Sequence, residues 1–538
     1  MKYRKAGALI AGSLAIGLLA ACSSGPAGSQ VSAAPAGDPV SGGTLVFGDV
    51  QPVTNAQTQG AGNYSVANLL GSVLDRLTYL DPDTQTLVPW IASSFEQNDT
   101  ATEFTFTIRD GVTFSDGTAL DAAAVAANLD LLGLGSAEKK IIANPNFVGY
   151  DRAEVVDDST VKVYFGTPNS NFLFATAGAT AGLVSPGTLA LDLDGQSDIS
   201  QIVGSGPFVF DSQVPEQEIT LVKRDDYAWP NEDSENQGAA YLDSVVIKVL
   251  AEVSLRAGAV TSGQVDVSRG IQPTDEQTLA DAGFQVIATR TTDLTANFAA
   301  FRLTNPATED VRVRQALQIG FDRDELVDTV LSDSYTPAAS ILPHGARGFT
   351  DLSDELAYDP DRAAALLDEA GWTLNADGLR EKDGVPLEVA LAASNQSVVF
   401  KPAFDFIAQQ WRELGVVLEN RAGDTTFMNA ALVDDTTAFV GTRLFVYGGL
   451  GPIFSSDANV WTRASIESLN DQFAAENASV DAAEQDELRA AQQQQIVLDD
   501  AIALVLWDET QVQGASPSVN IEFSGGDAPL FQSAWVAE

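Results

Sequence analysis

Apolar and polar residues alternate along much of the chain in ways that predict strands. Phe104, Phe106 and Ile108 alternate with polar residues, the period of two expected for a half-buried strand. The apolar run 44–47 ends at Gly48 and predicts a buried strand. Further apolar segments predict strands at Val161–Phe165, Ile219–Lys223, Val245–Leu250, Phe298–Leu303, Leu387–Leu391 and Ile502–Leu506.

Turn and capping residues add boundaries to this pattern. Asp110-Gly111 is typical of a hairpin turn and predicts a return strand that begins at Val112. Asp121 predicts the N-cap of a helix that runs through Leu132.

Helix signals are clearest in the second half of the chain. Asp322 with Glu325 predicts a capping box, and Asp359-Pro360 predicts an N-cap followed by the first helical residue. Apolar residues form a stripe on a predicted helix at 402–414. Strands and helices alternate irregularly, which predicts an α/β protein with mixed sheets and more than one lobe.

Length and composition narrow the function. The chain has 538 residues, enough for about three domains. Its net charge of −45 argues against nucleic-acid binding, which needs a basic surface. One Cys and one His cannot form a zinc or iron–sulfur site, and a single Cys forms no internal disulfide. These counts therefore predict no metal site built from Cys and His. We also predict no cofactor and no catalytic residues.

The N-terminus predicts export. A basic start is followed by the apolar run Ala6–Ala21, which is shorter than the ~20 residues that span a bilayer and is typical of a signal peptide. Leu19–Cys22 resembles a bacterial lipobox, which implies cleavage before Cys22 and acylation of its sulfur. Residues 22–40 are rich in Ser, Gly, Ala and Pro and predict a flexible tether. The body would lie outside the cytoplasm, in the periplasmic space or its equivalent, with the lipid as its only membrane contact.

A series of motifs in fixed order carries a family resemblance. The stretch Val73–Asp130, which includes "FTIRDGVTFSDGTALDAAAVAANLD", resembles the family 5 extracellular solute-binding proteins, the peptide-, opine- and nickel-type receptors of bacterial ABC importers. The resemblance continues through Gly204–Phe208, Leu221–Trp229, Leu242–Val267, Asp310–Leu331, Tyr358–Trp372 and Ile407–Glu419.

The resemblance implies a fold and an activity. The fold would be a two-lobed, periplasmic-binding-protein-like (type II) α/β fold with mixed sheets and an extra inserted domain. The protein would be a monomer that closes about a hinge on a small solute, most simply an oligopeptide or peptide-like molecule. It would deliver that solute to an ABC permease with ATPase subunits. The predicted divisions are 1–21 signal peptide, 22–40 tether, 41–75 plus 201–290 plus 501–538 lobe one, 76–200 inserted domain and 291–500 lobe two.

Three loops at predicted strand ends are where the family places its cleft: 55–64, 394–397 and 443–461. Aromatic and amide side chains in such loops suit a small polar ligand. We expect Phe445 and Phe454 to be core residues. The candidate ligand-binding residues are Asn63, Tyr64, Asn395, Gln396, Arg443, Tyr447, Asp457 and Trp461.

Other ligands and other classes of protein stay open. Residues 446–451 lack the acid that peptide receptors often place there, and Asp457 is a substitute at a different spacing. An opine or a chelated metal therefore remains an alternative ligand. A ligand-sensing or chaperone-like lipoprotein without a transport role is one rival class. A secreted glycosidase-type hydrolase is another, since 74 acids always offer carboxylate pairs.

Overall fold

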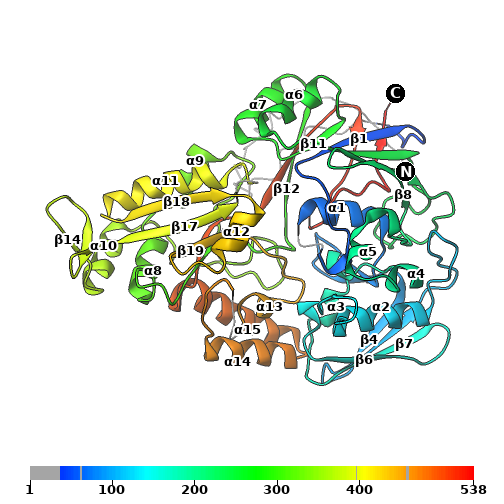
Figure 1. Ribbon diagram of the computed structural model, residues 1–538, viewed down its shortest axis with the longest axis horizontal. Coiled ribbons are helices and arrows are strands. Elements are labelled where there is room, and N and C mark those ends of the chain that lie inside the picture. Colours follow the sequence, from blue (N-terminus) through cyan, green and yellow to red (C-terminus); the bar gives the residue numbers. More distant parts are fainter. Residues whose placement is uncertain (1–36, 61–62, 395–396, 456–459, 527, 538) are drawn as a thin grey trace, which may run out of the picture.

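The computed structural model describes residues 37–60, 63–394, 397–455, 460–526 and 528–537. It contains three larger sheets, which Figure 1 shows at the upper right, the left and the lower right. We name the bodies built on them the seven-stranded lobe, the five-stranded lobe and the four-stranded unit. The chain has a mixed α/β architecture, as predicted.

The seven-stranded sheet combines parallel and antiparallel pairs. β1 is parallel to both of its neighbours, β10 and β11, and the outer strands are antiparallel. Its strands, in spatial order, are β12 (Gln285–Arg290), β21 (Thr510–Ala515), β11 (Val267–Arg269), β1 (Thr44–Asp49), β10 (Ser244–Val249), β9 (Glu218–Lys223) and β8 (Phe208–Val214).

The five-stranded sheet is covered on both faces, and its last strand, "ALVLW", is buried throughout. Burial on both faces explains why that strand reads as a continuous apolar run. Its strands, in spatial order, are β18 (Val417–Gly423), β17 (Glu388–Ser394), β19 (Phe439–Thr442), β13 (Asn297–Phe301) and β20 (Ala503–Trp507).

The four-stranded sheet is an antiparallel unit with its own core. Phe104 and Phe106 of β5 are fully buried, as their alternation predicted. The strands, in spatial order, are β4 (Ala92–Gln97), β5 (Glu103–Ile108), β7 (Thr160–Phe165) and β6 (Tyr150–Val155). Small sheets join β2 (Thr78–Leu80) to β3 (Leu87–Pro89), β22 (Val519–Asn520) to β23 (Trp535–Val536), and β14 (Thr373–Leu374), β15 (Arg380–Lys382) and β16 (Val385–Pro386).

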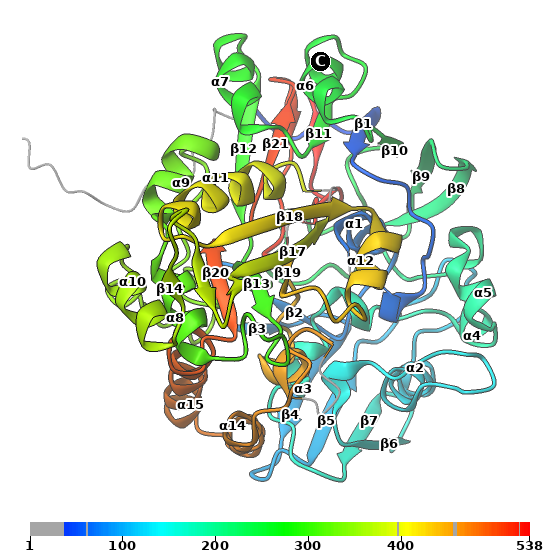
Figure 2. The ribbon, with the colours of Figure 1, turned by 60° about the vertical axis from the view of Figure 1, so that its left-hand side comes forward.

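Helices pack around these sheets, and Figure 2 shows α9 and α11 on one side of the five-stranded sheet. The α-helices are α1 (Tyr64–Val73), α2 (Ala122–Leu134), α3 (Phe172–Ala175), α4 (Pro186–Leu189), α5 (Leu193–Ser197), α6 (Arg256–Thr261), α7 (Pro273–Asp281), α8 (Val311–Ile319), α9 (Arg323–Val330), α10 (Pro360–Glu369), α11 (Phe400–Glu413), α12 (Thr425–Ala431), α13 (Gly451–Phe454), α14 (Glu467–Ala478) and α15 (Ala482–Gln494).

The chain crosses between the two larger sheets twice within the described residues. One crossing joins β12 to β13, and the other joins β20 to β21. The placement of β20 corrects the predicted start of the last lobe-one segment at residue 501. β20 pairs with β13 in the five-stranded sheet, so the second crossing falls at residues 508–509. An apolar run alone cannot reveal which sheet will take a strand, because both sheets bury such runs.

The predicted hairpin return at residue 112 is wrong. β5 pairs with β4 and β7, whereas Thr113 forms only an isolated bridge with Ala119. Gly111, with φ of 77°, turns the chain away from the sheet, and Val112 and Phe114 are buried in the core of the same unit. The apolar alternation therefore reflects a loop that packs beneath the sheet.

The three helix starts predicted at Asp121, Asp322 and Asp359 all have the expected caps. The Oδ1 atom of Asp121 accepts the backbone N–H of Ala124 over 2.9 Å, and Asp322 accepts that of Glu325 over 2.9 Å. The capping box predicted for Asp322 and Glu325 is only half formed. The Glu325 carboxylate accepts a hydrogen bond from Gln410 instead of reaching back to the N-cap residue.

We expect Asp121→Ala to lower the free energy of unfolding by about 1 kcal/mol, because α2 loses its N-cap. Urea denaturation followed by circular dichroism measures the change. Glu138→Ala, at an exposed position beyond the other end of α2, is the matched control and should leave stability unchanged. Equal stability of both variants would contradict the capping role.

Candidate functional site

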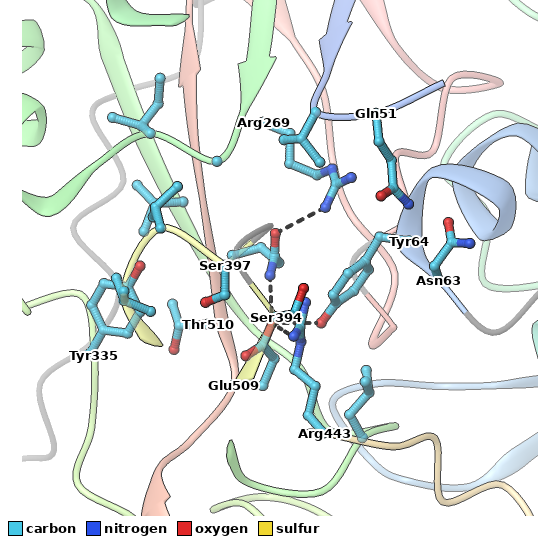
Figure 3. A pocket seen from close by; sticks show the side chains of 18 of the residues that line it. Gln51, Asn63, Tyr64, Arg269, Tyr335, Ser394, Ser397, Arg443, Glu509 and Thr510 are labelled. Carbon is cyan, nitrogen blue, oxygen red and sulfur yellow. Dashed lines mark hydrogen bonds and ion pairs between the residues drawn. The ribbon is translucent and has the colours of Figure 1, made fainter. Parts of the chain in front are cut away.

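A cavity of about 200 Å³ lies where strand ends of the two larger sheets meet (Figure 3). Gln51 follows β1 and Arg269 ends β11 in one sheet, while Ser394 ends β17 and Arg443 follows β19 in the other. β1 and β11 run parallel in the first sheet, and β17 and β19 run parallel in the second. The carboxyl ends of each pair therefore lie at one edge of their sheet, the position where α/β proteins commonly bind ligands. Other described lining residues include Asn63, Tyr64, Arg256, Tyr335, Ser397, Phe445, Trp507, Glu509, Thr510 and Gln511.

Tyr64 forms one wall of the cavity from the first turn of α1. Asn63 is the N-cap of that helix, and its Oδ1 atom accepts the backbone N–H of Val66 over 3.1 Å. The Tyr64 ring lies between two guanidinium groups, with Cζ of Arg269 5.3 Å and Cζ of Arg443 5.2 Å from its centroid. Both distances fall within the range of cation–π attraction, so the ring and the two arginines hold one another in place.

Glu509 is a buried carboxylate at the second chain crossing. Its Oε1 atom accepts the Tyr64 hydroxyl over 3.0 Å and the Gln511 amide over 2.5 Å, and it forms an ion pair with Nε of Arg443 at 2.7 Å. Its Oε2 atom accepts from Nδ2 of Asn297 over 2.6 Å. The carboxylate is therefore occupied by four protein groups from both sides of the cavity.

A second buried ion pair, between Arg269 and Asp49, supports the wall that the seven-stranded lobe contributes. The Nε and Nη2 atoms of Arg269 lie 3.0 and 2.5 Å from Oδ1 of Asp49, which also accepts the Ser65 hydroxyl over 2.9 Å. Arg269 and Asp49 are 4% and 1% exposed, so this charge pair is held out of water. It fixes the guanidinium group that faces Tyr64.

The balance of charge at the cavity is positive, in contrast to the whole chain. Among the described lining residues, Arg256, Arg269 and Arg443 are cationic and Glu509 is the one acid, while Asp49, which does not line the cavity, pairs with Arg269. Burial opposes the charge on Arg443, yet the Glu509 carboxylate and the Tyr64 hydroxyl keep its pKa above the ordinary value.

Arg256 has a structural role at the edge of this site. Its three guanidinium nitrogens donate to the backbone carbonyls of Leu250, Gly270 and Ala251 at 2.9, 3.0 and 3.0 Å. Burial, followed by the nearby Arg269 charge, lowers the pKa of Arg256 to about 10. The side chain thus anchors the loops that carry the cavity.

The structure brings only part of the predicted site together. Asn63, Tyr64 and Arg443 line the cavity. Tyr447 does not: it is buried against Gly178, and its ring stacks on Phe445 at 5.2 Å. Trp461 packs against the core of the five-stranded lobe instead. The predicted residues Cys22, Asn395, Gln396 and Asp457 lie outside the described residues.

One expectation for the aromatic residues is wrong and one is confirmed. Phe445 lines the cavity and contacts Tyr64 edge-on at 6.4 Å, so it is more than a core residue. Phe454 is 3% exposed and is a core residue, as expected. Phe445 lies in the loop after β19 and Phe454 ends α13, and the sequence of this Gly-rich segment does not show which of the two rings faces the cavity.

Sequence reasoning missed several cavity residues, above all Arg269, Glu509 and Gln511. A signal for Glu509 was present, because two consecutive acids follow the longest apolar strand run. Arg269 gave no comparable signal, since its partner Asp49 is 220 residues away.

Within the described residues, no helix has both the length and the apolar character that crossing a membrane requires. The same residues contain no group of three or more His, Cys, Asp or Glu side chains placed to hold a metal ion.

Two sheet-based lobes, joined by two crossings and enclosing a cavity, define the class of two-lobed ligand-binding proteins. The profile of the bacterial extracellular solute-binding proteins, family 5 (middle region), matches residues 86–461. The chain belongs to this family, a class of solute-binding proteins that work with ABC importers.

Individual relatives agree with this assignment. The chain is 25% identical over 362 residues to the glutathione-binding protein GsiB of Pectobacterium atrosepticum, covering 67% of this chain and 66% of that protein. It thus spans about two thirds of that relative's length. It shares its fold with NikA of Brucella suis in complex with Fe(III)-EDTA, with a TM-score of 0.78, 22% identity and coverage of 92% of this chain and 100% of NikA. The oligopeptide-binding protein AppA of Bacillus subtilis, bound to a nonapeptide, gives a TM-score of 0.79, 19% identity and coverage of 93% and 100%.

Proposed function

We propose that this protein captures a small polar solute in the cavity and delivers it to an ABC permease driven by ATPase subunits. The observation that carries the proposal is that both lobes contribute residues to the cavity wall. Tyr64 and Arg269 come from the seven-stranded lobe, whereas Ser394 and Arg443 come from the five-stranded lobe. A solute that contacts both walls stabilises the closed arrangement of the lobes, which is the form a permease would recognise.

The solute class that suits the cavity is a peptide-like molecule with at least one carboxylate. Glu509, the one acid among the described lining residues, already accepts three hydrogen bonds and forms an ion pair with Arg443, so it offers little to a ligand amine. Arg443 keeps a quarter of its side-chain surface exposed beside that acid. A guanidinium group is well suited to bind a carboxylate. The glutathione-binding relative supports a short peptide with carboxylate ends as the first candidate.

The proposed cellular setting follows from the N-terminal sequence. Residues 1–21 would direct export, and acylated Cys22 would anchor a monomeric body to the outer face of the cell membrane. The body would divide as predicted, except that lobe two continues through β20. Binding without chemical change distinguishes this function from that of a secreted hydrolase.

The test is to identify what the purified protein carries. The protein is denatured, released small molecules are identified by mass spectrometry, and binding of reduced glutathione and of short peptides is then measured by calorimetry. We expect a solute with a carboxylate to be released unchanged and to reduce the radius of gyration in small-angle scattering. Turnover of the solute, or binding without any change in the radius, would contradict the proposal.

Arg443→Met should weaken binding of reduced glutathione, or of the solute identified by mass spectrometry, by roughly 10- to 100-fold, because a charged hydrogen-bond donor is lost. Isothermal titration calorimetry measures the change. Arg412→Met removes the same charge from an exposed position of α11 and should leave the affinity unchanged. An unchanged affinity in Arg443→Met would remove Arg443 from the binding site.

A further inference from the structure

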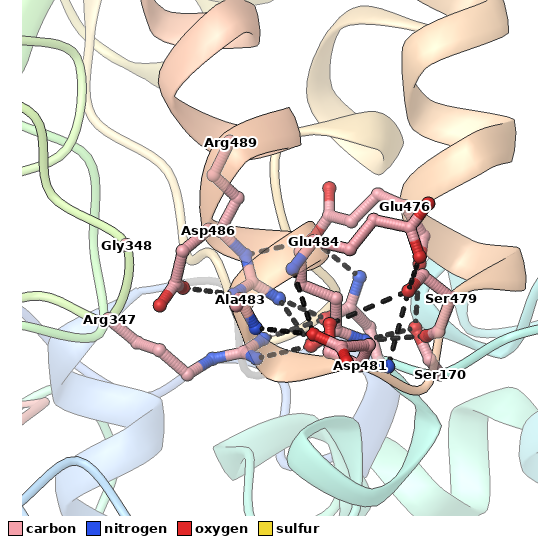
Figure 4. A network of polar contacts seen from close by, with 12 residues as sticks. Ser170, Arg347, Gly348, Glu476, Ser479, Asp481, Ala483, Glu484, Asp486 and Arg489 are labelled. Carbon is pink, nitrogen blue, oxygen red and sulfur yellow. Dashed lines mark hydrogen bonds and ion pairs between the residues drawn. The ribbon is translucent and has the colours of Figure 1, made fainter.

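The four-stranded unit contacts the five-stranded lobe away from the two crossings, which join that lobe to the seven-stranded lobe (Figure 4). Ser170 donates its backbone N–H to the carbonyl of Asn477 and its hydroxyl to that of Glu476, both over 2.9 Å. Gln485 donates its amide back to the Ser170 hydroxyl over 2.9 Å. The contact therefore joins residues more than 300 positions apart through backbone and side-chain groups alike.

Asn171 is the centre of this contact and is 1% exposed. Its Nδ2 atom donates to Oε1 of Glu476 over 3.1 Å, and its Oδ1 atom accepts from Nη2 of Arg347 over 2.7 Å. Arg347 also lies with Cζ 3.6 Å from the centroid of the Phe174 ring. Both ends of the amide and one ring of the four-stranded unit are thus bound by charged groups of the other lobe.

Glu476, which accepts hydrogen bonds from the four-stranded unit, is also held by partners within the five-stranded lobe. Nε of Arg489 on α15 lies 2.9 Å from Oε1 of Glu476 on α14, and Gln492 donates to Oε2 of Glu476 over 2.9 Å. These partners do not depend on the four-stranded unit. When the bodies separate, Glu476 keeps its counter-ion and Asn171 gains water, so the contact can open without leaving a bare buried charge.

The contact is continuous with the cavity. Gly449 approaches Asn171 so closely that an added Cβ would lie 3.2 Å from its Nδ2 atom, and Tyr447 fills the space beside Gly178. Tyr447 stacks on Phe445, which lines the cavity. Movement of the four-stranded unit away from this lobe would therefore release the segment that carries a cavity wall.

We infer that this contact, formed by Ser170, Asn171 and Phe174 with Arg347, Glu476 and Gln485, is a latch that holds the protein closed. Asn171 and Arg347 are positioning residues: in the part of the chain that the structure describes, they neither line the cavity nor bond to a residue that does, yet they set how often the closed cavity exists. The inference rests on the proposed function in one respect, that the lobes open and close. It adds that a closed form is populated before any solute arrives.

The test uses the full chain with Cys22→Ser and no added solute, labelled for single-molecule energy transfer through Glu138→Cys and Asp354→Cys, which are exposed on the two bodies. The parent should show a closed population. Asn171→Ala and Arg347→Met should each reduce the ratio of closed to open molecules by about tenfold, since each removes a charge-assisted hydrogen bond. Arg412→Met, which removes an exposed arginine elsewhere on the same lobe, should match the parent.

Two results would overturn the latch: a parent without a closed population, or identical distributions in all four proteins. Thermal unfolding of each variant shows whether it is folded, and Arg347→Met carries the test if Asn171→Ala is not. Because no solute is present, failure of reduced glutathione to bind would count against the proposed function and leave the latch intact.

Discussion

Replacing Asp49 with Ala is expected to lower the free energy of unfolding by about 3–5 kcal/mol, because it leaves the buried Arg269 charge without its partner. Asp49 and Arg269 are almost fully buried, and among the described residues Arg269 forms an ion pair with no other acid. The loss would also free the guanidinium group that lies against Tyr64. Urea denaturation followed by intrinsic fluorescence measures the change.

The matched control is Asp151→Ala. Asp151 also pairs with an arginine, Arg152, at 2.6 Å, but both side chains are more than half exposed. An exposed pair contributes little, so this variant should be as stable as the parent. A loss of less than 1 kcal/mol in Asp49→Ala would show that Arg269 finds water or another partner when Asp49 is absent.

Gly206→Ala is expected to cost about 3 kcal/mol, because an added methyl group would overpack the junction between α1 and β8. A Cβ at Gly206 would lie 2.6–2.7 Å from the backbone carbonyls of Ser72 and Val73. The Gly206 N–H also donates to the Val73 carbonyl over 2.9 Å, so the two segments cannot separate without losing a hydrogen bond. Denaturation in urea measures the effect.

Gly258→Ala, in the same lobe, is expected to raise the free energy of unfolding instead of lowering it. Gly258 lies on the exposed side of α6, and an added Cβ would meet nothing within 4 Å. Alanine is the better helix former, so this variant should be more stable by up to about 1 kcal/mol. A similar loss in both variants would mean that the Gly206 backbone moves to accept the methyl group.

Individual strands and helix caps could be predicted well because each is determined by residues that are close together in the sequence. The alternation in β5, the buried run in β20 and the cap at Asp121 each follow from neighbouring residues. The hairpin return at residue 112 failed because an alternating segment can pack beneath a sheet as well as within one. Nor could any local pattern show that β20 joins the sheet of β13.

The site was harder to predict than the fold because its partners are distant in the chain. Tyr64 meets Glu509 across 445 positions, and Arg269 meets Asp49 across 220. Loops at strand ends were the right places to search, which explains why Arg443 and Tyr64 were found. Tyr447, on the same loop as Arg443, faces the four-stranded unit instead, and its aromatic character fits either position.

The location of Glu509 on a chain crossing has a consequence for redesign. This residue binds Arg443 and Tyr64, and it also belongs to the segment that must twist if the lobes part. A substitution there would alter recognition and mechanics together, and its effects would be hard to separate. The serine wall, at Ser394 and Ser397, lies off the crossings and is the better starting place for engineering a new specificity.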